Sequence, residues 1–285
     1  MNEATKLFLH WIKERHNVYL NRQSGHKKPW TEDKILQEAF FTNPYRENDK
    51  VTKWVNKEIR QPFKECTPSA IIFAIGCFRW FNYIPTGVIL NRYGLLRSWN
   101  TEKAVSALES ISGQVFTGAF NISNSGSTKP KINRVCEDYV APLWESSGRI
   151  AQAVRNLNTL QGTHSVLMRV PGLGGSGFMA AQIVCDLKYT KVLAKADDWW
   201  TWCSPGPGSR RGLNRILDKP IDSPVPKNWL EEINELRKIV NNKISVQNQW
   251  QTFHAQDIQN CLCEYDKYCR VLNNEGRSKR RYAGK

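Results

Sequence analysis

The chain has 285 residues and carries 41 Lys and Arg against 26 Asp and Glu, a formal net charge of +15. This surplus favours a nucleic acid partner through Coulomb attraction and counterion release, with a generally basic soluble protein as the alternative. No run of about 18 apolar residues is present, which excludes a membrane span. Because the first residues lack the profile of a signal peptide, we expect a cytoplasmic protein with no membrane partner.

Helical periodicity begins at once. Apolar residues recur at three- and four-residue steps and predict a helix from Glu3 to about Gln23. Thr31 is placed to cap a second helix over Ile35 to Phe41. The next run, Phe41-Thr-Asn-Pro-Tyr-Arg-Glu-Asn-Asp49, is dense in hydrogen-bonding side chains. This loop is either a binding segment or a solvated connection to a helix over Lys50 to Ile59.

The stretch from Pro68 to Ile84 is strongly apolar and predicts a central core helix. Arg79 and Asn82 interrupt it, three residues apart and hence on one face. Polar groups on a buried helix need partners, which a substrate or another part of the protein can supply.

A polar, Gly- and Ser-rich loop over residues 121–131 is the expected hinge between two lobes. It divides an N-terminal helical lobe, residues 1–130, from a C-terminal lobe, residues 131–285. Strand alternation is not evident, so the predicted fold is mostly α. Further helices are expected over Thr101 to Ser112, Cys136 to Trp144, Ile150 to Leu160, Trp229 to Asn242 and Asn248 to Leu272.

The run Arg169-Val-Pro-Gly-Leu-Gly-Gly-Ser-Gly-Phe-Met-Ala-Ala reads as a helix ending in Val170, a tight turn and a second helix. This helix-hairpin-helix pattern is suited to gripping a nucleic acid phosphate. Gly172 and Gly174 can adopt positive φ and, with Gly175, place no Cβ between backbone amides and a phosphate oxygen. A purely structural turn between helices would use the same residues.

Two carboxylates, Asp197 and Asp198, precede Trp199 in a cluster of tryptophans. A carboxylate in a partly dry aromatic pocket can act as a base or stabilise positive charge, and a tryptophan can stack an extruded base. Alternatively, the tryptophans belong to the core and the acids cap the next segment.

Two Pro-Gly steps, Pro205-Gly206 and Pro207-Gly208, predict irregular structure at the turn over residues 206–211. The turn resembles an anion receptor, with exposed amides, the Ser209 hydroxyl, and the Arg210 and Arg211 guanidinium groups for phosphate oxygens. A solvated basic loop is the alternative.

Metal sites are not expected. The eight cysteines form no Cys-x-x-Cys pair, and the five histidines form no paired ligand motif. We predict buried, reduced thiols, no metal and no cofactor.

Several motifs in the same order together resemble one family. They are the run from Phe41 to Asp49, Val115-Phe-Thr-Gly-Ala-Phe120, Gly177-Phe-Met-Ala-Ala-Gln-Ile-Val-Cys-Asp-Leu-Lys-Tyr189, Asp198-Trp199, Gly206-Pro-Gly-Ser-Arg-Arg-Gly-Leu-Asn-Arg215 and Cys263-Glu-Tyr-Asp-Lys-Tyr268. The chain is similar to the α-glutamyl/putrescinyl thymine pyrophosphorylases, or amino acid:DNA transferases. These are related to the helical domain of hydroxymethyluracil DNA kinases. The resemblance implies a two-lobed fold like that of helix-hairpin-helix DNA glycosylases.

The resemblance also implies a reaction in phage hypermodification of thymine. An amine or amino acid would displace pyrophosphate from 5-pyrophosphoryloxymethyluracil in double-stranded DNA, after a kinase has made that base. The expected enzyme is a transferase that extrudes its target base, works as a monomer and, if phage-encoded, resides in the host cytoplasm.

Site roles follow from the same resemblance. Arg210 and Arg211, with Ser209, would hold the leaving pyrophosphate, and Asp198 would take a proton from the amine. Asp186 and Lys188 are the second candidates for catalysis. The expected pocket residues, each of which can equally be a member of a buried salt bridge, are Asn43, Arg46, Asp49, Arg79, Asn82 and Trp199.

Two departures narrow the function. Ser176 stands where glycosylase-lyases place a Schiff-base lysine, which argues against strand cleavage. The kinase motif Gly-x-x-x-x-Gly-Lys-Ser/Thr is absent from the sequence, so we do not expect phosphorylation. A monofunctional DNA glycosylase and a non-catalytic DNA-binding module remain as alternatives.

Overall fold

The structure is a computed structural model and describes residues 1–120, 122, 126–244 and 250–276. Its regular elements there are helices, with no β-strand among them, which confirms the mostly α prediction. None of these helices combines the length and the apolar character needed to cross a bilayer.

The chain forms two compact units. Unit 1 joins Met1–Asp49 to Trp200–Lys285, and unit 2 is Lys50–Trp199. The boundary expected near residue 130 therefore falls inside unit 2. Of the expected hinge loop, residues 121 and 123–125 lie outside the described residues, as do residues 245–249 of the last predicted helix and its preceding link.

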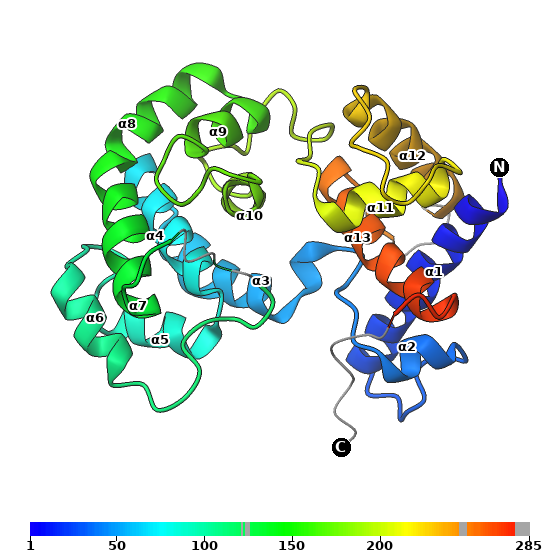
Figure 1. Cartoon of the computed structure of the whole chain (residues 1–285), viewed down its shortest axis with the longest axis horizontal. Helices are drawn as coiled ribbons and strands as arrows, with labels where there is room; N and C mark the ends of the chain where they lie inside the picture. The colour runs from blue at the N-terminus through cyan, green and yellow to red at the C-terminus, as the bar shows by residue number, and fades with distance from the viewer. Residues whose placement is uncertain (121, 123–125, 245–249, 277–285) are drawn as a thin grey trace. The chain divides into compact units, whose positions relative to one another are not determined.

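In unit 1 the first helix of the chain packs against the last one that the structure describes. Phe8, Trp11 and Ile12 of the first helix share one buried cluster with apolar residues of the last helix, such as Ile258 and Leu262. This long-range packing is why a local reading of the sequence misplaces the boundary. The α-helices of unit 1 are α1 (Glu3–Gln23), α2 (Lys34–Glu38), α11 (Pro207–Ile216), α12 (Trp229–Ile244) and α13 (Ala255–Leu272) (Figure 1).

Two local expectations in unit 1 are corrected. Asp33, not Thr31, caps α2, with its carboxylate accepting the Leu36 amide at 3.0 Å. The expected irregular turn at residues 206–211 is instead the start of α11. Proline is tolerated in the first turn of a helix because its missing N–H has no intrahelical acceptor there, and the Ser209 hydroxyl accepts the Gly206 amide at 2.9 Å.

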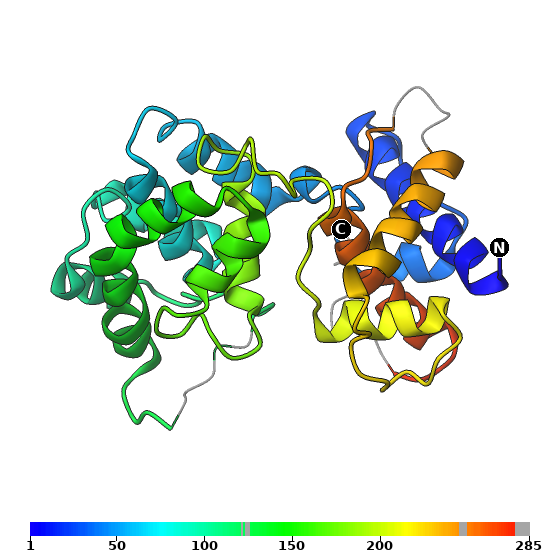
Figure 2. The same ribbon diagram turned by 90° about the horizontal axis from the view of Figure 1, so that it is seen from above.

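Helices α11 and α13 pack very closely in unit 1, as the view from above also shows (Figure 2). A Cβ on Gly212 would lie 2.1 Å from the backbone oxygen of Leu262, and one on Gly208 would lie 2.4 Å from Cys263 Sγ. The two glycines are four residues apart and hence on one face. They permit an approach that any side chain would block.

The predicted core helix α4 (Pro68–Phe81) lies in unit 2, where it packs against α8 and α10. Thr67 caps α4, and Asn82 ends it in the left-handed region at φ 45°. The other α-helices are α3 (Lys50–Val55), α5 (Ile84–Arg92), α6 (Thr101–Glu109), α7 (Lys131–Arg134), α8 (Ala141–Leu157), α9 (Leu160–Leu167) and α10 (Phe178–Leu187).

The hairpin lies between α9 and α10, so residues 168–177 connect two helices as the pattern predicts. The first helix ends at Leu167, three residues before the expected end at Val170. Gly172 adopts φ +80° and Gly175 adopts φ +66°, but Gly174 does not have positive φ. Position 174 requires glycine for a steric reason, because a Cβ there would lie 2.9 Å from the Met168 carbonyl oxygen.

Candidate functional site

The hairpin presents unused backbone donors. The N–H groups of Gly172, Gly174 and Gly175 donate to no acceptor in the described part of the chain. A Cβ on Gly172 would lie 2.4 Å from Tyr139 and 2.8 Å from Trp80, whose rings stack with centroids 4.6 Å apart. The hairpin is thus pressed onto this aromatic pair with its amides available for an anion. Contact of these amides with DNA remains a prediction.

Asp198 caps α9, the first helix of the hairpin. Its two carboxylate oxygens accept the amides of Leu160 and Gln161 at 2.6 and 3.0 Å. Asp198 therefore does cap a helix, as the alternative expects. The capped helix, however, precedes Asp198 in the chain instead of following it. A negative charge is stabilised at a helix N-terminus, and each carboxylate oxygen has a second lone pair to offer. A role for Asp198 as a base is compatible with this geometry and untested by it.

Asp197 has a smaller part. It is exposed, and its Oδ1 accepts the Asn158 side-chain amide at 3.3 Å. Asn158 ends α8 in the left-handed region at φ 44°. Both acids thus fasten the segment before Trp199 to the junction between α8 and α9.

Lys188 and Trp199 are bound to one another. Lys188 is fully buried, and its Nζ lies 3.8 Å from the centre of the Trp199 ring and donates to the Trp199 carbonyl at 3.0 Å. The indole N–H of Trp199 donates back to the Lys188 carbonyl at 2.8 Å. These bonds give both predicted site residues partners inside unit 2.

Arg79 finds its partner in Asp186. The guanidinium donates to both carboxylate oxygens, at 2.5 and 2.8 Å, and a third bond at 2.6 Å reaches Asn82 Oδ1. Arg79 is 2% exposed and Asp186 is fully buried. Three predicted site residues, Arg79, Asn82 and Asp186, therefore lie together. Arg79 and Asp186 form a buried ion pair between α4 and α10, which is the arrangement expected if these residues are members of a buried salt bridge.

The loop from Phe41 to Asp49 folds onto α13 in unit 1. Asn43 donates to Asp49 Oδ1 from its backbone and its side chain, at 2.9 and 2.8 Å. The Arg46 amide contacts Asp257 at 3.4 Å, and Asn260 donates to the Asn43 carbonyl at 3.0 Å. Burial raises the pKa of Asp49. Asn43, Arg46 and Asp49 are thus neighbours, as the sequence predicts, at an inward-facing polar junction.

The side chains of Ser209 and Arg210 form hydrogen bonds with backbone groups of the protein itself. Arg210 Nη1 donates to the carbonyls of Asp222 and Ser223, both at 2.9 Å, and so fixes the loop after α11. The Ser209 hydroxyl accepts from Gln259 at 3.1 Å and is fully buried. Their predicted contact with phosphate would need these groups to exchange partners.

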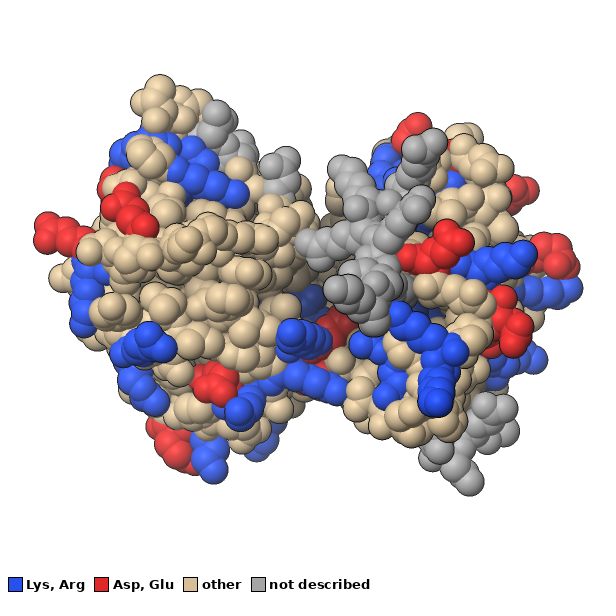
Figure 3. All heavy atoms as spheres, turned by 90° about the horizontal axis from the view of Figure 1, so that it is seen from below, with Lys and Arg blue, Asp and Glu red and all other residues tan. Residues whose placement is uncertain are grey.

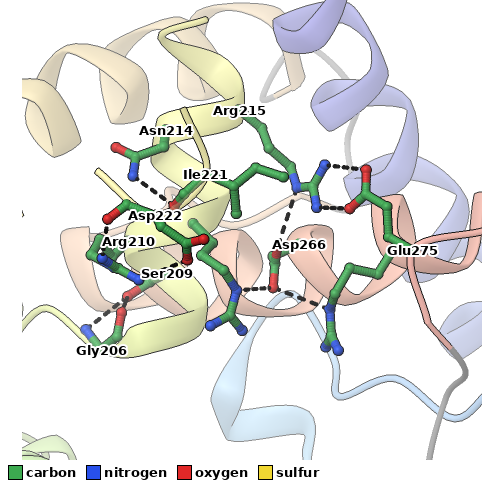
Figure 4. Close-up of polar contacts among 11 residues, drawn as sticks. Gly206, Ser209, Arg210, Asn214, Arg215, Ile221, Asp222, Asp266 and Glu275 are labelled. Atoms are coloured by element: carbon green, nitrogen blue, oxygen red, sulfur yellow. Dashed lines mark hydrogen bonds and ion pairs between the residues drawn. The ribbon is translucent and has the colours of Figure 1, made fainter. Parts of the chain in front are cut away.

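Arg211 has a different environment, centred on a carboxylate for which the sequence suggests no role. Asp266 of α13 is fully buried and lies 2.9 Å from Arg211 Nε, 3.1 Å from Arg215 Nε and 3.4 Å from Arg270 Nε. Arg215 also contacts Glu275, as Figure 4 shows, and this hydrogen bond lowers the pKa of Glu275 to about 2. We call Arg211, Arg215, Arg270, Asp266 and Glu275 the arginine cluster.

The arginine cluster keeps unused donors and positive charge. Three guanidinium groups face two carboxylates. Arg211 and Arg270 approach Asp266 with Nε, and their Nη atoms donate to no acceptor in the described ranges; these side chains are 27% and 38% exposed. Two such groups held by one buried carboxylate can bind phosphate oxygens.

Elsewhere, Lys and Arg side chains are spread over the face seen in Figure 3, on both units, with Asp and Glu between them. Six of the eight cysteines are buried and all eight are free thiols. Among the residues that the structure describes, no three His, Cys, Asp or Glu side chains gather in a group that could hold a metal ion.

Two comparisons with known proteins find a likeness. The family described as 5-hmdU DNA kinase, helical domain, matches residues 2–278. The 5-hmdU DNA kinase of Bacillus phage SP10 is 22% identical over 226 residues, which cover 73% of this chain and 35% of that protein. The chain thus matches well under half of this relative's length. No solved structure matches, and the likeness to glycosylases stays a prediction.

Proposed function

Because the chain belongs to the family of 5-hmdU DNA kinase helical domains, we propose that it modifies thymine-derived bases in DNA. An amine or amino acid attacks the exocyclic methylene of 5-pyrophosphoryloxymethyluracil. The carbon–nitrogen bond forms, the carbon–oxygen bond to pyrophosphate breaks, and the ammonium proton passes to a base. The class of substrate rests on the name of the phage relative and on the motifs shared with amino acid:DNA transferases.

Phosphorylation by this chain is the less favoured chemistry. A P-loop kinase uses Gly-x-x-x-x-Gly-Lys-Ser/Thr to cradle the phosphates of its nucleotide, and this motif does not occur in the sequence. The proposal therefore assigns this chain the step that consumes a phosphorylated base.

The arginine cluster is the observation that carries the proposal. Charge develops on the pyrophosphate oxygens as the bond to carbon breaks, and donors fixed beforehand stabilise that charge most effectively. Asp266 accepts a hydrogen bond from Arg211 Nε and forms a longer ion pair, at 3.4 Å, with Arg270 Nε. The Nη groups of both arginines are left for such oxygens. We accordingly add Arg270 to the predicted pyrophosphate site, beside Arg211.

Asp198 keeps its predicted role as the base in this proposal. Its two amide bonds fix the orientation of the carboxylate, and each oxygen keeps a second lone pair that can accept a proton. Ser209 and Arg210 would act indirectly, by fixing the start of α11 and the loop that follows it.

The arginine assignment is tested by the rate of pyrophosphate release from DNA that carries the activated base. We expect Arg211→Gln and Arg270→Gln each to lower the rate by about 10²-fold, the size of effect of losing one charge-stabilising donor. Lys13→Gln, which removes an exposed positive charge of α1, is the matched control and should change the rate less than about twofold.

Affinity for unmodified DNA separates two roles of the arginines. The proposal predicts that both variants bind unmodified DNA almost as tightly as the unaltered protein. If affinity falls as much as the rate, the arginines contact the DNA backbone, and the leaving-group assignment is wrong.

A further inference from the structure

Unit 2 contains a cavity of about 500 Å³ to which the proposed reaction assigns no role. It lies where the first turn of α4, the C-terminal part of α8 and the segment after α10 meet. No residue of the hairpin lines it. Pro68, at the start of α4, lines the cavity, whereas the hairpin contacts Trp80 near the other end of that helix. At a rise of about 1.5 Å per residue these two positions are about 18 Å apart, so the cavity is a separate feature.

Three cationic side chains without a partner line this cavity. Arg155, Lys191 and Lys195 are exposed, and their side chains form no hydrogen bond or ion pair in the described part of the chain. No Asp or Glu is among the lining residues. The positive end of the α4 dipole adds to the same potential, because Pro68 is the first residue of that helix. Like charges around one hollow repel each other, so an anion is the ligand that this lining attracts.

The rest of the lining is mostly apolar and narrows the class of anion. Its carbon-only side chains are Pro68, Ala151, Val154, Val192 and Ala194. A free inorganic anion loses hydration against such walls and gains no contact in return. A ligand in which each phosphate is joined to a carbon ring fits both parts of the lining. Deoxyribose supplies that ring beside every phosphate of DNA, so the lining favours the sugar–phosphate backbone.

Asn158 connects the cavity to the segment that carries Asp198. Asn158 lines the cavity, and its side-chain amide donates to the Lys195 carbonyl at 3.1 Å and to Asp197 Oδ1 at 3.3 Å. Its own carbonyl accepts the Asp197 amide at 3.1 Å. A DNA strand held in this cavity therefore lies beside the residues that precede the proposed base.

We propose that this cavity binds the sugar–phosphate backbone of DNA. Arg155, Lys191 and Lys195 hold phosphate oxygens, and the apolar side chains pack against deoxyribose. Such contacts fix the position of the strand and read no base sequence. The inference rests on the proposed function in one respect, namely that DNA is the substrate. It adds a surface for that substrate on the far end of α4 from the hairpin.

Lysine footprinting tests the proposal on the unaltered protein. The protein is acetylated with acetic anhydride alone, with unmodified duplex DNA or with inorganic pyrophosphate, and mass spectrometry gives the extent of reaction at each lysine. We expect duplex DNA to suppress acetylation of Lys191 and Lys195, whereas Lys103, exposed in α6, reacts as before. Equal protection of all three lysines, or none at Lys191 and Lys195, overturns the proposal. Protection of Lys191 and Lys195 by pyrophosphate as strong as that by DNA identifies a free anion as the ligand and also overturns it.

The salt dependence of DNA affinity gives an independent measurement. Lys191→Gln combined with Lys195→Gln should weaken binding of unmodified duplex about tenfold and make the slope of log affinity against log salt shallower by about 2, because each phosphate contact contributes about 0.9. Lys103→Gln combined with Arg149→Gln is the matched control, since it removes two exposed charges of unit 2 outside the cavity. Equal slopes for the two double variants would refute the backbone contact.

The inference and the proposed function fail in different ways. Base transfer by a protein whose Lys191 and Lys195 are not protected by DNA overturns this inference alone. Protection of both lysines by DNA, without any transfer product, overturns the proposed function alone.

Discussion

Lys188 and Trp199 exchange hydrogen bonds between side chain and backbone: Lys188 Nζ donates to the Trp199 carbonyl at 3.0 Å, and the Trp199 indole donates to the Lys188 carbonyl at 2.8 Å. Because the Lys188 ammonium is fully buried in this pair, it stabilises the segment that carries Asp198.

We expect Lys188→Met to lower the free energy of unfolding by about 1–3 kcal/mol, since the Trp199 carbonyl loses a buried donor. Chemical denaturation measures this loss. A Lys188→Met protein of unchanged stability that has lost all transfer activity would show instead that the ammonium is catalytic.

Asp198→Asn separates capping from catalysis. The substitution removes a charge from the N-terminus of α9 and should cost about 1 kcal/mol of stability. Thr159→Ala is the matched control, because the Thr159 hydroxyl caps the same helix by accepting the Gly162 amide at 3.0 Å. If Asp198 is the base, Asp198→Asn abolishes turnover and Thr159→Ala does not. Similar activity in two equally destabilised variants would leave Asp198 with a structural role only.

Gly212→Ala probes the contact on which the arginine cluster depends. Its Cβ would meet the Leu262 backbone oxygen at 2.1 Å, so α11 must move away from α13. We expect a loss of about 1–3 kcal/mol in stability and weaker binding of pyrophosphate. Gly148→Ala, in α8 with no atom within 4 Å of the added Cβ, should instead stabilise the protein by about 0.5–1 kcal/mol. Equal effects of both substitutions on unfolding and on pyrophosphate affinity would refute the close-packing account.

His16 makes stability depend on pH. Burial, and then the charge of Arg15, lower its pKa from 6.5 to about 4, and neither ring nitrogen has a hydrogen-bond partner in the described chain. The unfolded chain therefore takes up a proton first as pH falls, so stability is complete above about pH 6.5 and declines toward about pH 4.

Between about pH 7 and about pH 4.5 this loss should reach about 2–3 kcal/mol, and His16→Gln should be free of it. Urea unfolding at the two pH values measures the difference, with exposed His10→Gln as the control. A His16→Gln protein with the same pH dependence as the unaltered chain would contradict the assignment to His16.

Local patterns predicted much of this fold, and long-range pairing explains most of what they missed. The periodicity of α1 and the apolar run of α4 are properties of neighbouring residues and are visible in the sequence. The bond from Asp198 to α9 joins residues 38 apart, and Arg211 meets Asp266 across 55 residues. No local rule pairs such residues.

The arginine cluster did leave a partial signal. Arg211 and Arg215 are four residues apart in one motif, and Asp266 and Arg270 have the same spacing within α13. Residues so spaced share a helix face, but only the packing of α11 on α13 brings the two faces together. The irregular structure that the Pro-Gly steps predict does not occur, because the residues that break a helix interior are favourable at its first turn.

The central claim is tested most directly by the mass of the nucleosides that the protein leaves behind. Duplex DNA carrying 5-pyrophosphoryloxymethyluracil is incubated with the protein and a panel of amines and amino acids, then digested to nucleosides and analysed by mass spectrometry. The account predicts a nucleoside in which the pyrophosphate is replaced by one of the amines, with release of one pyrophosphate for each base converted. An abasic site in place of that nucleoside would identify a glycosylase, and unchanged nucleosides across the whole panel would contradict the proposed transfer.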